Sequence, residues 1–155
     1  PKELSVLPEV IEKQKRLIER VHAMGAEVLL SSPTRVVMNA EQVVEHAKAM
    51  ASRGPDAIKI VTPCLNEDQL IEAFRAIVAL KRALKIPFQY QCHGEYGKLT
   101  RVMGPMLGSM LVFCNQRYTQ YTFNEQPLIR AMRSVFQNVN WSVPPSVEEQ
   151  KFDRA

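Results

Sequence analysis

The chain alternates between helical segments and short apolar segments, and this alternation limits its fold more than any other feature. Apolar residues at helical spacing predict helices over residues 8–24, 39–50, 66–84, about 100–107 and about 126–138. Nearly continuous apolar runs between them predict strands over residues 27–31, 57–61, 88–92 and 110–114. Strands that alternate with helices run parallel and are joined by right-handed crossovers. We therefore expect an α/β fold with four parallel strands and flanking helices.

The spacing of these strands leaves two architectures open. About 30 residues separate one strand from the next, which fits βαβ units. Such units build either an open doubly wound sheet or half of an eight-stranded barrel. Periodicity alone does not separate the two.

Size and charge exclude several classes of protein. The 155 residues indicate one domain. Hydrophobic residues make up 46% and charged residues 23%, and no apolar run approaches the roughly 18 residues of a membrane span, so we expect neither disorder nor a membrane. The net charge of +4 is spread along the chain without a basic stripe, so we expect no nucleic-acid partner.

The cysteines bear on the cellular compartment. Cys64, Cys92 and Cys114 are odd in number and lie in or beside apolar runs, which favours buried free thiols over a disulfide framework. We therefore expect an intracellular protein, in the cytoplasm or nucleus. No charged and then apolar leader follows Pro1, so we expect that targeting information is absent or was removed with whatever preceded this residue. No set of His, Cys, Asp and Glu has metal spacing, and no phosphate-binding glycine loop opens a helix, so neither metal nor cofactor is expected.

Two features carry the chemistry. Lys59 stands in the middle of a predicted strand between Ile58 and Ile60. It is either an edge-strand lysine that reaches solvent or a desolvated amine whose depressed pKa makes it nucleophilic toward carbonyls. Arg101 follows a loop with two glycines just past a strand end, where it could bind a carboxylate, although such a loop is also an ordinary tight connection.

Together these segments resemble the type I 3-dehydroquinate dehydratases. The resemblance is carried by A-I-K-I-V-T-P at 57–63, N-E-D at 66–68, H-G-E-Y-G-K-L-T-R at 93–101, L-G-S-M-L-V-F at 107–113 and a later glutamine. It implies the C-terminal half of a (β/α)8 TIM-type barrel over residues 1–143, with a linker or tail over residues 144–155. Residues 3–5 would end the fourth strand of that barrel.

The resemblance also implies roles for single residues. The family dehydrates 3-dehydroquinate through an imine, or Schiff base, on a strand lysine, which Lys59 matches. Its M-G-x-x-G-x-x-S-R motif is matched at 93–101, so Arg101 is the expected carboxylate-binding arginine. Its closing S-x-P-G-Q loop is matched at 122–126, so Thr122 and Gln126 are expected to contact substrate.

The departures from the family pattern concern catalysis. The general-base histidine of the family's S-x-H-D segment is replaced by Pro33, which cannot accept a proton. The closing loop lacks its proline and glycine. His93 replaces the methionine of the glycine motif and either faces the pocket or fills the methionine's space.

An intact imine lysine without its base resembles the dehydroquinase-like domain of the fungal quinate-pathway repressors. That resemblance implies a catalytically inactive regulatory module that binds a transcription activator, or a pathway metabolite such as 3-dehydroquinate. The alternatives are a divergent dehydratase, a lyase acting through Lys59, and an unrelated α/β binding domain. Half a barrel leaves open edges and an inward face that we expect to include Leu29, Ile58 or Ile60, Tyr90 and Val112. A homodimer, or docking on a missing N-terminal half, would cover them.

Overall fold

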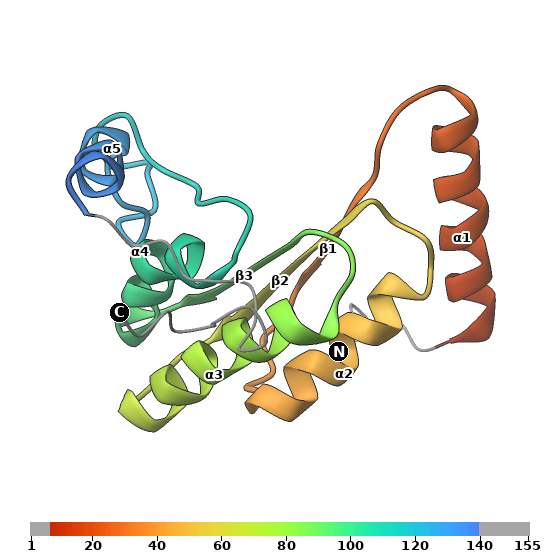
Figure 1. Cartoon of the computed structure of the whole chain (residues 1–155), viewed down its shortest axis with the longest axis horizontal. Coiled ribbons are helices and arrows are strands. Elements are labelled where there is room, and N and C mark those ends of the chain that lie inside the picture. Colours follow the sequence, from red (N-terminus) through yellow and green to blue (C-terminus); the bar gives the residue numbers. More distant parts are fainter. Residues whose placement is uncertain (1–6, 140–155) are drawn as a thin grey trace, which may run out of the picture.

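The alternation of helices and strands is present in the computed structural model, which describes residues 7–139. Its elements are, in chain order, α1 (Pro8–Ala23), β1 (Leu29–Pro33), α2 (Ala40–Ala51), β2 (Ala57–Pro63), α3 (Glu67–Ala83), β3 (Phe88–His93), the 3-10 turn η1 (Glu95–Gly97), α4 (Lys98–Leu107) and α5 (Ile129–Asn138). The α/β fold predicted from the sequence is therefore confirmed (Figure 1). The segment at residues 3–5 and the tail at 144–155 lie outside the described residues.

The sheet is parallel and has the order β1-β2-β3. Its central strand β2 carries Lys59, which pairs with Ser31 of β1 and Gln89 of β3. Helices α2 and α3 lie side by side against one face of the sheet, whereas α1 and α5 lie at opposite ends of the molecule (Figure 1).

The hydrophobic core lies between the sheet and these two helices. Alternate residues of β2 and β3 point into it and join apolar side chains of α2 and α3, the sheet residues being Ile58, Ile60, Phe88, Tyr90 and Cys92. The expectation that Ile58 or Ile60 and Tyr90 face inward, away from the helices, is therefore wrong. Since side chains alternate along a strand, Lys59, Val61 and Gln91 occupy the other face.

The predicted fourth strand at residues 110–114 does not form in the described residues. The Met110 N–H donates to the carbonyl of Phe88 at 2.8 Å, which starts a ladder on β3. The chain then turns away, because the Asn115 N–H donates to the Pro127 carbonyl at 2.9 Å and the Asn115 carbonyl accepts from Ile129 N–H at 2.9 Å. This competing pairing diverts the segment and leaves a sheet of three strands.

The same pairing explains why α5 begins later than predicted. Residues 126–128 were expected to be helical, but Pro127 and Leu128 pair with Asn115 and the helix begins at Ile129. At the other end of the sheet, β1 runs two residues further than predicted and includes Pro33. Proline is tolerated there because β1 pairs only with β2 in the described residues and its other edge needs no ladder.

The three cysteines are free, as the sequence predicts, and Cys64 and Cys92 are buried, whereas Cys114 is only partly buried. Burial raises the pKa of the Cys92 thiol, which lies 3.4 Å from the Thr62 hydroxyl. None of the helices within residues 7–139 is long and apolar enough to cross a membrane.

We predict that His46 on α2 makes the free energy of unfolding depend on pH below about 6.5. Burial and then the charge of Arg53 lower the pKa of this half-buried side chain, whose Nε2 lies 2.9 Å from the Ser32 hydroxyl. The unfolded chain therefore takes up the proton at a higher pH than the folded chain. Stability is full above the unfolded pKa and falls as the pH drops toward the folded pKa.

Urea unfolding between pH 5 and pH 8 checks this prediction. The variant His46→Gln keeps a polar group near Ser32 but cannot titrate, so it should lose less stability than the native chain on acidification. Identical pH profiles of the two proteins would contradict the prediction.

Candidate functional site

A pocket of about 550 Å³ opens on the face of the sheet opposite the helices. The strands contribute Pro33, Lys59, Val61, Gln91 and His93 to its lining. The remaining lining residues come from α4 and from the segment that follows it, and are Arg101, Phe113, Phe123, Glu125 and Gln126. We call this the strand-end pocket.

Lys59 reaches the strand-end pocket from the middle of the sheet. Its side chain is half-buried, and its Nζ lies 4.8 Å from the centroid of the Phe113 ring, which is a cation–π contact. Because β1 and β3 flank β2, Lys59 is on a central strand. The alternative of a lysine on an edge strand is therefore wrong.

The glycine loop between β3 and α4 requires its two glycines. Gly94 has a φ of +95°, and a Cβ atom there would lie 2.8 Å from the Cys64 carbonyl oxygen. A Cβ atom on Gly97 would lie 2.8 Å from the Cys92 backbone. The Thr100 hydroxyl then accepts from the Cys92 N–H at 2.9 Å and donates to the Gly97 carbonyl at 2.6 Å. The first turn of α4 is thereby held against the end of β3, which fixes the position of Arg101.

The guanidinium of Arg101 is buried and only partly satisfied. Arg101 is 5% exposed, and its Nη2 donates to Glu125 Oε2 at 3.0 Å. Its Nε and Nη1 are buried and have no partner among the described residues. Buried charged donors without acceptors are costly, so these two nitrogens indicate a place where an acceptor from a ligand would be stabilised.

Glu125 supplies the acceptor for one nitrogen of this guanidinium. Its Oε1 accepts from the Gly94 N–H at 2.7 Å while its Oε2 holds Arg101. Sequence reasoning missed Glu125, because it was considered only as one of the residues replacing the closing-loop proline and glycine. The available signal was an acid directly before Gln126, where the family pattern has glycine.

The structure brings together most of the residues predicted for the site. Lys59, His93, Arg101 and Gln126 all line the strand-end pocket. Thr122 does not, because its hydroxyl accepts from the Thr119 N–H at 2.9 Å and donates to the Thr119 carbonyl at 3.0 Å. The substrate contact expected of Thr122 stays a prediction.

Pro33 lines the same pocket at the end of β1. It pairs with Val61, two residues beyond Lys59 along β2. A proline side chain has no group that can accept or donate a proton. Pro33 therefore supplies shape to the pocket and no acid or base.

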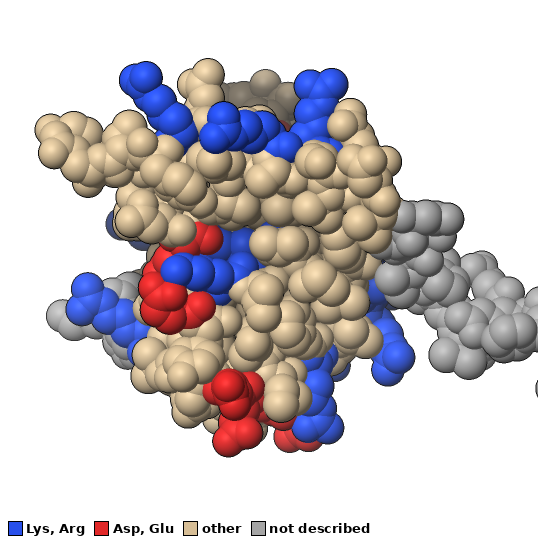
Figure 2. Space-filling view, turned by 90° about the vertical axis from the view of Figure 1, so that its left-hand side faces the viewer, with Lys and Arg blue, Asp and Glu red and all other residues tan. Residues whose placement is uncertain are grey.

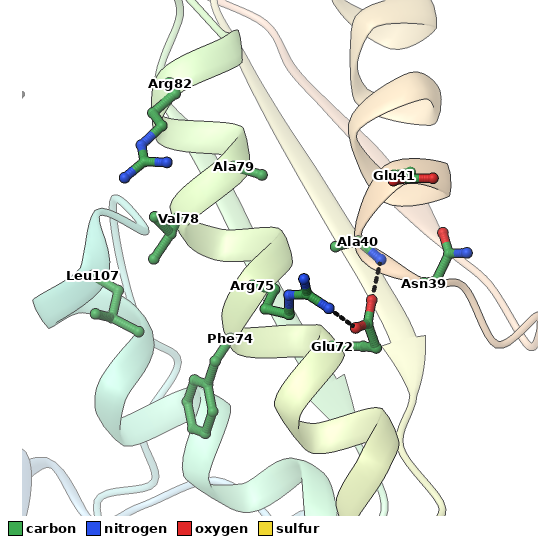
Figure 3. Close-up of a pocket in the computed structure, with 10 residues that line it drawn as sticks. All are labelled: Asn39, Ala40, Glu41, Glu72, Phe74, Arg75, Val78, Ala79, Arg82 and Leu107. Carbon is green, nitrogen blue, oxygen red and sulfur yellow. Dashed lines mark hydrogen bonds and ion pairs between the residues drawn. The ribbon is translucent and has the colours of Figure 1, made fainter.

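A second hollow, of about 830 Å³, lies on the opposite side of the protein among α2, α3 and α4 (Figure 3). Of its two acids, Glu41 and Glu72, the second accepts from the Ala40 N–H at 3.0 Å and from Arg75 Nη1 at 2.8 Å. These two contacts, the backbone one first, lower the pKa of Glu72. The carboxylate thus serves to join α2 to α3, and neither Lys59 nor Arg101 lines this hollow.

Charge and metal chemistry add no further site. On the face shown in Figure 2, charged side chains lie in small groups among uncharged surface, and the group in the middle contains both acidic and basic side chains, without a continuous basic stripe. Within residues 7–139, no three His, Cys, Asp or Glu side chains gather as metal ligands would.

Comparisons with known proteins agree with this geometry. The profile of the type I 3-dehydroquinase family matches residues 3–140. No curated protein matches the sequence. A type I 3-dehydroquinate dehydratase from Clostridium difficile, solved with covalently modified comenic acid, is similar with a TM-score of 0.74 and 19% identity over 82% of this chain and 50% of that chain.

Two further solved structures give the same result. The 3-dehydroquinate dehydratase from Geobacillus kaustophilus has a TM-score of 0.74 and 18% identity, over 81% of this chain and 49% of its own. The 3-dehydroquinate dehydratase from Enterococcus faecalis has a TM-score of 0.69 and 18% identity, over 82% of this chain and 49% of its own. The described chain therefore folds as part of a TIM-type barrel and spans about half the length of these relatives.

We predict that Gly97→Ala destabilises the protein by about 1–3 kcal/mol, because the new methyl group would overlap the Cys92 backbone. The matched control is Gly104→Ala within α4, where the nearest atom to a new Cβ lies 3.6 Å away. The control should be neutral or stabilising by up to about 1 kcal/mol, since alanine restricts the unfolded chain. Equal unfolding free energies for the two variants would contradict the close approach at Gly97.

Proposed function

Because the chain belongs to the type I 3-dehydroquinase family, we propose that it binds a carboxylate-bearing ketone such as 3-dehydroquinate without dehydrating it. One observation carries the proposal. Lys59 and Arg101, suited to bind a carbonyl and a carboxylate, line one pocket in which Pro33 stands at the position of the family's base. The pocket thus keeps the groups for binding and has no proton acceptor at the position where the family has its base.

The binding chemistry follows from these two side chains. Arg101 would bind the ligand carboxylate through its guanidinium, two nitrogens of which have no partner among the described residues. The uncharged amine of Lys59 would attack the ketone carbon, the carbonyl oxygen would leave as water, and a C=N bond to Nζ would remain. Dehydration would next require a base to take a proton from the carbon beside the imine, and Pro33 cannot accept it.

We extend the proposal to a regulatory role, in which the ligand-bound domain contacts a transcription activator. Its support is the loss of the base together with retention of the lysine and arginine. An intracellular location, in the cytoplasm or nucleus, belongs to the same proposal and is supported by the free cysteines.

A divergent dehydratase is the second candidate, and His93 favours it. This half-buried histidine ends β3 and lines the strand-end pocket with Lys59. An imidazole there would be a base on a different strand from the one the family uses. Its activity would depend on His93, whereas binding alone would not.

The two candidates are separated by mixing the protein with 3-dehydroquinate. We expect no enone absorbance from product, because loss of a positioned base costs about 10²–10⁴ in rate. Calorimetry should detect binding that weakens by tenfold or more in Arg101→Met, as expected for loss of a buried charge-assisted contact. The control is Arg75→Met, since Arg75 lines the second hollow among α2, α3 and α4, and this variant should bind 3-dehydroquinate as the native chain does.

Turnover at a rate typical of enzymes, about 1–10³ per second, would overturn the proposal. If that turnover disappears in His93→Ala, the second candidate is correct. Absence of both turnover and binding would contradict both candidates.

Assembly is a further part of the proposal. In the described residues β1 pairs on one side only, and Leu29 on the uncovered face is 43% exposed. Unpaired strand edges and exposed apolar groups favour association. We predict that the 155-residue chain forms a homodimer, or binds an N-terminal half-barrel supplied separately. Sedimentation equilibrium at micromolar concentration checks this, and a stable monomer that ignores the added half would contradict it.

A further inference from the structure

We propose that Glu125 is a built-in carboxylate that occupies the ligand position on Arg101, so that a ligand carboxylate must displace it. This inference rests on the proposed function and deepens it. It makes Glu125 a residue that sets ligand affinity from within the same pocket. Glu125 itself performs no chemistry on the ligand.

The contacts of Glu125 are those that a bound carboxylate would make. One oxygen accepts from the Arg101 guanidinium at 3.0 Å, and the other accepts from the Gly94 N–H at 2.7 Å. Both donors belong to the glycine loop and the helix that follows it. A charged guanidinium and a backbone N–H that converge on one anion form a carboxylate site, and here the chain supplies the carboxylate itself.

The geometry of the guanidinium makes the two carboxylates compete. A carboxylate binds arginine in a fork through Nη1 with Nη2, or through Nε with Nη2. Both forks include Nη2, the nitrogen that Glu125 holds, and Nε and Nη1 have no partner among the described residues. A ligand carboxylate that binds in either fork must therefore displace Glu125 from Nη2, which weakens its binding.

Glu125 is placed where it can move away. Its side chain is 30% exposed, whereas that of Arg101 is 5% exposed. In the segment that carries Glu125, Tyr121 is 87% exposed and Phe123 is 73% exposed. These large side chains therefore pack little against the rest of the protein. The arginine stays fixed by α4 while the glutamate is the partner that leaves.

The variant Glu125→Gln tests the proposal, because it removes the charge and keeps an oxygen that can accept from the Gly94 N–H. Glu95→Gln is the matched control, since Glu95 lies in the same glycine loop but pairs with Lys98 and is 82% exposed. In calorimetric titration with 3-dehydroquinate at low salt, the Kd of Glu125→Gln should be at least tenfold lower than that of the native chain. The control should bind within about twofold of the native chain, as expected of an exposed pair.

A second measurement needs no ligand. In ¹⁵N NMR spectra of the free protein, Glu125→Gln should shift the Arg101 Nε–H signal, and Glu95→Gln should leave it in place. An unchanged signal would overturn the inference, because Glu125 would then not hold the guanidinium.

The failures of the two proposals differ in their results. Equal or weaker binding by Glu125→Gln than by the native chain overturns displacement and leaves the binding function intact. No binding by any variant, with the Arg101 signal shifted as expected, overturns the binding function and displacement together.

Discussion

The buried guanidinium of Arg101 is the group on which the candidate site depends. Arg101 is 5% exposed, and a buried charge requires acceptors. Glu125, which lies 24 residues further along the chain, supplies one of them at the open face of the sheet. Its position is set by Thr100, whose hydroxyl joins the end of β3 to the first turn of α4. One ionic contact thus connects the glycine loop, a helix and the segment that lines the pocket. It leaves two nitrogens for a further acceptor.

The fold and several of the residues that line the strand-end pocket could be predicted because their signals are local. Helical spacing and short apolar runs identified the three strands and five helices, and Lys59 stood out as a charge in the middle of an apolar strand. The prediction of a fourth strand was wrong because the composition of residues 110–114 is typical of a strand. The pairing of Asn115 with Leu128 depends on residues that are distant in the sequence, and composition does not reveal it. Glu125 was missed for the same reason, since its partners Arg101 and Gly94 adjoin it only in the folded chain.

The two faces of the sheet serve different purposes. One face is apolar and packs on α2 and α3, and this packing determines the fold shared with the solved dehydratases. The other face carries Lys59, Gln89 and Gln91, and Gln89 Nε2 donates to Gln91 Oε1 at 2.9 Å. At 18–19% identity the likeness to those enzymes concerns the fold alone. Pro33 and Glu125 line the pocket on the second face and lie outside the core.

The central claim is that Lys59 still forms an imine in a pocket that no longer dehydrates its ligand. Borohydride reduction in the presence of 3-dehydroquinate tests it most directly, because hydride adds to the imine carbon and leaves a stable secondary amine on the lysine. Peptide mass spectrometry should then find the intact, undehydrated ligand attached to Lys59 of the native chain, and no attachment in Lys59→Met. An unmodified Lys59, or a dehydrated adduct on it, would contradict the account.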